Sequence, residues 1–180
     1  MMDGAVAPLK AGTLFTSPRS LEDFQLTDLS NVPFTRQALQ GRWTLLTFGY
    51  TTCPDVCPMI MHTFVDVQKA MRSRGFGDEV LQFAFVSVDP ERDTLVRLKE
   101  YLNYFSPTFL GATGSQSALR SLTGQLRIFY QRVGEGGSYA IAHSASVFLI
   151  DPSARLCALF DPPQNADKME DDLVVIMRKQ

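Results

Sequence analysis

The sequence predicts an α/β fold in which a central mixed sheet is flanked by helices. Over residues 43–88, two apolar strand-like segments enclose an amphipathic helix, which is the pattern of a right-handed βαβ unit. Two more helices, a strand and a hairpin follow, and another helix closes the chain. The length of 180 residues is enough for one domain with a substantial core.

The composition is that of a globular protein without a basic or acidic bias. Hydrophobic residues make up 45% and charged residues 20% of the chain, and the formal net charge is -2. This balance gives no support for a nucleic-acid partner. No apolar run reaches the ~18 residues of a membrane span, and the first residues lack a signal-peptide pattern. We therefore expect a cytosolic protein, or one whose export or anchor segment is missing from this chain.

The N-terminal part is expected to divide into a lead-in and the start of the domain. Residues 1–20 are rich in Gly, Pro, Ser and Ala and predict a flexible lead-in, with residues 21–180 forming a single domain. Residues 21–40 predict short strands and a turn. Residues 43–50 (WTLLTFGY) are apolar, aromatic and β-branched, and they predict a buried strand.

A helix is expected over residues 55–73, after the turn that follows the first buried strand. Its apolar residues recur every three or four positions, which gives one buried face, and Gly75 ends the helix. Alternation over residues 80–88 (VLQFAFVSV) predicts the next strand. Asp93 is placed to cap a helix over residues 94–105.

The second half of the chain predicts shorter elements. A helix is expected over residues 115–124 and a strand over residues 127–132, before a glycine-rich loop. Residues 146–151 and 155–160 predict a hairpin that turns at a Pro-Ser pair. Residues 165–179 predict the closing helix.

Two of the three cysteines, Cys53 and Cys57, are four positions apart. An odd, small number of cysteines argues against a disulfide scaffold. Residues at i and i+4 share one helix face, so both sulfurs are expected to face one point at the end of the first buried strand. A helix N-terminus favours the thiolate, which is the species that binds metal or attacks a disulfide. A local structural disulfide, or two unrelated buried cysteines, is the alternative.

The ligand chemistry of this cysteine pair narrows the choice of metal. Soft sulfur binds Cu(I), zinc or iron–sulfur clusters. Two cysteines are too few for a typical cluster, and structural zinc requires four nitrogen or sulfur ligands, which the chain does not place together.

The two histidines, His62 and His143, are the candidates for a nitrogen ligand. His62 lies about 140° around the helix from Cys57, so we expect it to point away as a surface or packed side chain. His143 follows the glycine-rich loop and precedes a strand, where a loop can bring a ligand to the end of the sheet. From the residues alone, His143 is as well explained as an ordinary polar side chain as it is as a third ligand.

Five further side chains are candidates for a role in or beside the site. Met61 is expected to pack in the core, and Met59 to lie off the cysteine face. Asp55 is expected to be exposed, where it tunes the cysteines or meets a partner. Asp89 either caps its own turn or tunes the site from beside it. Cys157 is expected to be a small packed side chain.

Three sequence blocks, taken together, resemble the SCO/SenC copper-chaperone family. They are FGYTTCPDVCPMIM (residues 48–61), FVSVDPERDT (residues 85–94) and AHSASVFLIDPSARL (residues 142–156). Any one block alone is a weak signal, whereas the three in this order are specific. The similarity covers most of the chain.

The resemblance implies a thioredoxin-like fold with copper, as Cu(I) or Cu(II), bound by Cys53, Cys57 and His143. It implies that the two cysteines form a redox-active pair that cycles through a disulfide, and that Asp89 lies beside the site. It further implies work in assembling the copper centre of cytochrome c oxidase. The implied partner is the copper-binding subunit of the oxidase or another copper chaperone.

The resemblance also implies a place in the cell. We expect the periplasm or an equivalent oxidising compartment, with anchoring to the inner membrane. Because the chain shows no such anchor, membrane association is expected through a segment absent from it.

Three functions fit these residues. The first, which we favour, is a copper metallochaperone. The second is a thiol–disulfide oxidoreductase that reduces the cysteines of the copper-site target, with Cys53 as the attacking thiolate and Cys57 as the resolving cysteine. The two roles are compatible, because copper delivery needs reduced thiols. The third is a thiol peroxidase, which is disfavoured because no activating arginine is evident beside Cys53.

Overall fold

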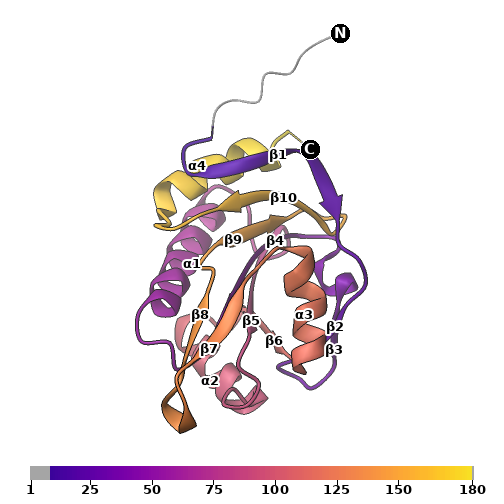
Figure 1. The fold of residues 1–180 in the computed structure, drawn as a ribbon. Coiled ribbons are helices and arrows are strands. Elements are labelled where there is room, and N and C mark those ends of the chain that lie inside the picture. The colour runs from indigo at the N-terminus through magenta and orange to yellow at the C-terminus, as the bar shows by residue number, and fades with distance from the viewer. Residues whose placement is uncertain (1–8, 180) are drawn as a thin grey trace.

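The structure, a computed structural model, describes residues 9–179. Those residues form one eight-stranded sheet, a separate two-stranded sheet and four α-helices (Figure 1). No helix among them is both long and apolar enough to cross a bilayer. The strands are β1 (Gly12–Ser20), β2 (Gln25–Asp28), β3 (Pro33–Thr35), β4 (Trp43–Gly49), β5 (Leu81–Ser87), β6 (Leu110–Thr113), β7 (Tyr130–Val133), β8 (Ala140–His143), β9 (Val147–Ile150) and β10 (Arg155–Phe160). The helices are α1 (Val56–Ser73), α2 (Leu95–Phe105), α3 (Gln116–Gln125) and α4 (Ala166–Met177), with 3-10 turns at η1 (Arg36–Leu39) and η2 (Gly136–Ser138).

The large sheet is parallel in its middle and antiparallel towards its edges. Its strands follow the order β1-β10-β9-β4-β5-β6-β2-β3. β5 pairs in parallel with both β4 and β6, and the other described pairings are antiparallel. α1 connects β4 to β5, so the expected βαβ unit is present and the sheet is mixed, as the sequence predicts.

Alternate residues of the central strands enter two hydrophobic clusters on opposite faces of the sheet. On β4, Leu45 packs with residues of α1, α2 and α4, whereas Leu46 packs with residues of α3. On β5, Phe83 and Ala84 divide in the same way. The two-residue period of a strand therefore places α1 and α4 on one face, and α3 with the β7–β8 hairpin on the other (Figure 1).

α1 has the amphipathic spacing that the sequence predicts. Ile60, Phe64, Val67 and Met71 are all buried along one face of the helix. Gly75 follows with a φ of +86°, which is a left-handed conformation that glycine adopts without a steric penalty. The helix therefore runs from the cysteine turn to Ser73 and ends there.

The N-cap of α2 is Thr94, and the expectation that Asp93 caps this helix is wrong. The Thr94 hydroxyl accepts a hydrogen bond from the backbone N–H of Arg97 at 3.2 Å. Asp and Thr are both good N-cap residues, so two of them in succession make the position of the cap ambiguous. The Asp93 carboxylate binds the cysteine turn instead, through Thr51.

β1 extends the sheet into the segment for which we expected a loose lead-in. Gly12–Ser20 pairs with β10 as an edge strand, so this part of the expectation is wrong, while residues 1–8 lie outside the described residues. The pairing is irregular between Leu14 and Arg19, around Pro18, and much of β1 is exposed. Such a strand lacks the apolar alternation that would reveal it. The sequence also fails to predict the four-residue strands β6 and β8.

Candidate metal centre

Cys53 and Cys57 lie at the carboxyl end of β4, where the chain turns into α1. The N–H of Cys53 donates to the Tyr50 carbonyl at 3.1 Å, which closes the turn before the helix. Cys57 lies in the first turn of α1 and is buried, whereas Cys53 is half-buried. Ligands of α/β proteins bind at this end of the strands, so the pair stands where a ligand can reach it.

His143 comes to the same point from the β7–β8 hairpin. It is the last residue of β8, and its Nε2 atom lies 3.5 Å from the Sγ atom of Cys57. The potential ligand atoms of Cys53, Cys57 and His143 all lie within 4.8 Å of one another. The structure therefore brings the three predicted ligands together, at a spacing that one metal ion could bridge.

The imidazole of His143 is oriented by two neighbours. Its Nδ1 atom lies 2.9 Å from the Ser144 carbonyl oxygen. Because a carbonyl can only accept, Nδ1 donates its proton to this carbonyl, and Nε2 is the ring nitrogen that faces the cysteines. The ring also meets Tyr50 edge-on, with 5.9 Å between the ring centroids. In a neutral ring this arrangement leaves the lone pair of Nε2 for a metal ion.

Gly49, the last residue of β4, leaves room for the sulfur of Cys57. A Cβ atom at this position would lie 2.6 Å from Cys57 Sγ and 2.9 Å from the ring of Phe85. Neither neighbour has free space to move into, because both are buried. The close approach of helix and strand at the site therefore depends on glycine.

The two cysteines differ in acidity. The pKa of Cys53 is lowered from 9.0 to about 3, chiefly because the Cys57 thiol donates a hydrogen bond to its sulfur. The pKa of Cys57 is raised, because it is the donor in this pair and because it is buried. We expected the helix N-terminus to favour both thiolates, whereas the surroundings favour the thiolate at Cys53 and the thiol at Cys57.

The other candidates lie where the sequence predicts, away from the three ligand atoms. His62 is exposed and packs edge-on against Phe105, with centroids 5.1 Å apart. Met61 is fully buried in the core, and Met59 is 61% exposed. Asp55 is exposed. The thiol of Cys157 is buried, and it donates to the Leu149 carbonyl.

Asp89 anchors the hairpin that carries His143. Its buried carboxylate accepts a hydrogen bond of 2.6 Å from the Tyr139 hydroxyl and forms an ion pair with Arg92. Arg92 in turn donates to the Tyr139 carbonyl at 2.7 Å and stacks 3.6 Å from the centroid of its ring. Asp89 therefore acts on the site by holding the hairpin that carries His143. Among the described residues, it forms no hydrogen bond with a cysteine. The sequence gives no sign of Arg92 as a partner.

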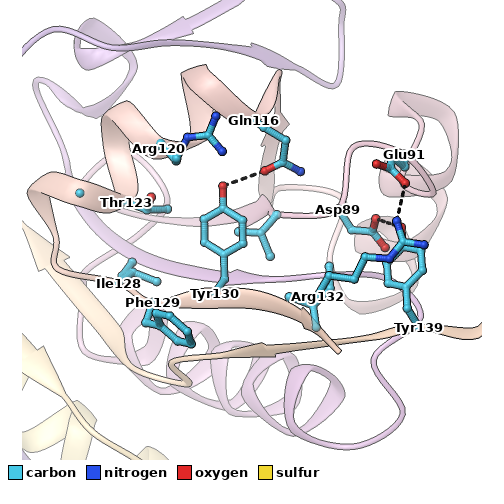
Figure 2. A pocket seen from close by; sticks show the side chains of 13 residues that line it. Asp89, Glu91, Gln116, Arg120, Thr123, Ile128, Phe129, Tyr130, Arg132 and Tyr139 are labelled. Atoms are coloured by element: carbon cyan, nitrogen blue, oxygen red, sulfur yellow. Dashed lines mark hydrogen bonds and ion pairs between the residues drawn. The ribbon is translucent and has the colours of Figure 1, made fainter. Parts of the chain in front are cut away.

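A pocket of about 590 Å³ lies between α3 and the hairpin, next to this anchor (Figure 2). Tyr130 stands in it and donates from its hydroxyl to Gln116 at 2.9 Å. On the opposite wall of the pocket, the guanidinium group of Arg132 stacks on the ring of Tyr139, 3.6 Å from its centroid. None of the three candidate ligands lines this pocket, so it is distinct from the metal centre.

Comparison with known proteins places the chain in a family. The family model described as SCO1/SenC matches residues 15–178. The chain belongs to the SCO1/SenC family. The resemblance seen in the three sequence blocks is thus confirmed.

Relatives within the SCO1/SenC family include copper-bound proteins. A SCO2-like protein of Rickettsia conorii is 33% identical over 136 residues, which are 74% of this chain and 65% of that protein. The crystal structure of Arabidopsis thaliana ScoI with copper bound matches with a TM-score of 0.83 and 30% identity, over 88% of this chain and 98% of that one. The structure of Bradyrhizobium japonicum ScoI with copper bound matches with a TM-score of 0.76 and 34% identity, over 86% of this chain and 98% of that one.

These matches confirm the fold, and they show what share of a relative's length this chain covers. The fold is thioredoxin-like and belongs to the α/β class, as expected. The chain spans 65% of the length of the Rickettsia conorii relative.

Proposed function

We propose that this SCO1/SenC protein is a metallochaperone that binds one copper ion through Cys53, Cys57 and His143. The observation that carries the proposal is that three soft or borderline ligand atoms lie within 4.8 Å of one another at the end of β4. Thiolate sulfur selects Cu(I), and imidazole suits copper in either oxidation state. The copper-bound structures of two relatives support the same metal.

The site is suited to passing its ion on. Cys57 is buried and held by α1, whereas Cys53 is half-buried and lies in a turn. Three protein ligands leave one side of the ion open to a fourth ligand from a partner. Loading a second thiolate requires Cys57 to lose its proton, so metal binding releases a proton and strengthens with rising pH.

The delivery target that best fits the family is the copper-binding subunit of cytochrome c oxidase. Another copper chaperone would supply the ion or share in its transfer. Such work belongs in the periplasm or an equivalent oxidising compartment, at the membrane that holds the oxidase.

The first experiment is a titration of reduced, anaerobic protein with Cu(I) and, separately, Cu(II), against a competing chelator. One tightly held copper per chain is expected, and it should be lost when both Cys53 and Cys57 are changed to Ser. His143→Ala should lower Cu(II) affinity by more than the ~10–100-fold typical of outer-shell partners, because Cu(II) depends on the imidazole nitrogen more than Cu(I) does.

His62→Ala is the matched control for this titration. It removes the chain's other imidazole from an exposed position away from the cysteines, so copper affinity should not change. If His143→Ala binds Cu(II) as tightly as His62→Ala does, the ligand assignment is wrong. If the wild-type protein holds no copper against the chelator, the metallochaperone proposal fails as a whole.

A second candidate function is thiol–disulfide exchange, and the unequal cysteines favour it. The Cys53 thiolate would attack a target disulfide, form a mixed disulfide and release one target sulfur as a thiolate. Cys57 would then give up its proton to the target thiolate released in the first step and attack the Cys53 sulfur. This step frees the second target sulfur and leaves the protein oxidised as a Cys53–Cys57 disulfide. A dithiol reductant must restore the pair for another cycle.

The two functions separate at His143. A reductase should reduce a model disulfide without copper, and His143→Ala should retain that activity while Cys53→Ser loses it. Equal loss of activity in both variants would count against a simple dithiol reductase.

A further inference from the structure

Asp93 is a fully buried carboxylate that holds the turn before Cys53. Its side chain has 0% exposure and accepts three hydrogen bonds. The backbone N–H and the hydroxyl of Thr51 donate at 2.9 and 2.6 Å, and the hydroxyl of Ser87 donates at 2.6 Å. The carboxylate thus ties the segment after β4 to the end of β5 at a point two residues from Cys53.

Hydrogen bonds to a buried carboxylate are among the stronger ones in proteins. Two of the three go to a single residue, Thr51, and fix both its backbone and its side chain. Arg97 adds a third contact on Thr51, donating from Nε to the hydroxyl oxygen at 3.0 Å. The direction in which the chain leaves β4, and hence the place of the Cys53 sulfur, is set before any metal arrives.

The charge of Asp93 is not neutralised by a direct ion pair. Among residues 9–179, no Lys, Arg or His side chain forms an ion pair with it. Both oxygens of the carboxylate accept hydrogen bonds from Thr51, two residues before Cys53, so its field acts beside the turn that carries this candidate ligand. In a buried setting such a field is screened much less than in water.

We propose that Asp93 is a positioning residue of the metal centre, which presents Cys53 to the ion and whose buried negative charge favours bound Cu(II) over bound Cu(I). The first half follows from the bonds to Thr51. The second follows from charge, because the Cu(II) site carries one more positive charge than the Cu(I) site and gains more from a nearby anion. The inference rests on the proposed copper site and assigns it an electrostatic bias.

The test compares Asp93→Asn with Asp172→Asn. Both residues are buried carboxylates that accept three hydrogen bonds, but those of Asp172 come from the backbone N–H groups of Lys10, Ala11 and Gly12, far from the ligands. Both variants should unfold at lower urea concentration. Only Asp93→Asn should weaken copper binding, by roughly tenfold for Cu(I) and roughly a hundredfold for Cu(II). The extra tenfold raises the Cu(II)/Cu(I) reduction potential by about 59 mV.

Thr51→Val tests the position of the Cys53 turn without removing the charge of Asp93. It can also be measured if Asp93→Asn does not fold. It removes one hydroxyl from the turn and leaves the carboxylate in place. Cu(I) and Cu(II) affinities should fall by the same factor, with no change in reduction potential. Metal-free protein supplies an independent readout, because the amides of Thr51 and Cys53 should exchange with D2O faster in Asp93→Asn and Thr51→Val than in wild type or Asp172→Asn.

Each result decides one part of the inference. Copper affinities in Asp93→Asn equal to those in Asp172→Asn overturn the positioning role. Equal losses of Cu(I) and Cu(II) in Asp93→Asn overturn the electrostatic bias. A wild-type protein that holds no copper defeats the proposed function, and the amide exchange of metal-free protein then still tests whether Asp93 fixes the turn.

Discussion

Cys53 and Cys57 are the same chemical group four positions apart, and their surroundings make them different. Cys57 lies on α1 against Gly49 and Phe85, with 1% exposure, whereas Cys53 lies in the turn and reaches solvent. The thiol of Cys57 donates to the half-buried sulfur of Cys53, and backbone N–H groups at the start of the helix add to the effect. These surroundings lower the pKa of Cys53 and raise that of Cys57, which favours the thiolate at the first and the thiol at the second.

This difference predicts the pH dependence of thiol reactivity. The pKa of Cys53 lies well below its usual value, at about 3, so its thiolate fraction stays nearly constant between about pH 5 and pH 8. Iodoacetamide should therefore label Cys53 at a nearly constant rate across this range. An ordinary cysteine would slow about tenfold per pH unit below its pKa. Quenched-flow labelling with peptide mapping measures the rate at each cysteine.

Two controls accompany the labelling experiment, one in the native protein and one in the unfolded protein. Cys57 should remain unlabelled in the native protein, because its pKa is raised and its sulfur is buried. Urea-unfolded protein should label all three cysteines with ordinary pH dependence. A native Cys53 rate that falls tenfold per unit would show that its thiolate is not stabilised.

Sequence reasoning at the residue scale predicts the candidate ligands but not the residues that support them. Cys53 and Cys57 stand out by their spacing, and His143 by the family resemblance of the block around it. Asp93 does not, because an Asp before a Thr at the start of a helix reads equally as a cap. Whether such a carboxylate faces solvent or the turn of a neighbouring strand depends on the packing of β4 against β5, which the local sequence does not encode.

At the scale of elements, the connection between β5 and α2 organises both halves of the centre. Its first part, through Asp89 and Arg92, holds the hairpin that carries His143. Its last part, Asp93, holds the turn that carries Cys53. One short connection thus contacts the two segments that carry Cys53 and His143, candidate ligands from distant parts of the chain.

The contacts of the hairpin predict that substituting Arg92 destabilises the protein more than substituting Arg132. Arg92 and Arg132 each stack 3.6 Å from the Tyr139 centroid, but only Arg92 pairs with the buried Asp89. Arg92→Gln leaves a buried carboxylate without its counter-charge and should cost about 3–5 kcal/mol of unfolding free energy. Faster amide exchange on β8, and weaker Cu(II) binding through His143, should accompany it.

Arg132→Gln is the matched control for the hairpin. Arg132 is paired with Glu91, and both side chains are largely exposed, at 45% and 66%. Its loss should cost no more than about 1 kcal/mol. Equal effects of the two substitutions on β8 exchange would mean that the Asp89–Arg92 pair does not anchor the hairpin.

At the scale of the molecule, the sequence predicts the central architecture and loses accuracy towards the edges of the sheet. β4, α1 and β5 are buried and periodic, so their pattern is plain. β1 is an exposed edge strand with an irregular pairing, and its partner lies near the other end of the chain. Its structure follows from long-range contacts with β10 and α4, which local periodicity does not report.

Those contacts predict that removing residues 1–20 destabilises the whole domain. β1 covers the edge of β10, and Lys10 and Ala11 before it, with its first residue Gly12, supply three backbone N–H groups to the buried carboxylate of Asp172. Leaving that carboxylate without donors should alone cost about 1–3 kcal/mol of unfolding free energy. Urea unfolding followed by the fluorescence of Trp43, the single tryptophan, measures the loss. Copper stoichiometry should stay at one per chain, because β1 supplies no ligand.

Lys10→Ala distinguishes the backbone hydrogen bonds to Asp172 from the surface ion pair of the Lys10 side chain. That substitution removes an exposed ion pair with Asp171 and keeps the backbone bonds to Asp172, so the urea midpoint should not move measurably. A truncated protein as stable as Lys10→Ala would show that residues 12–20 behave as the loose lead-in that their composition predicts. A truncated protein that is destabilised but still binds one copper would show that β1 supports the fold and is not needed for the metal centre.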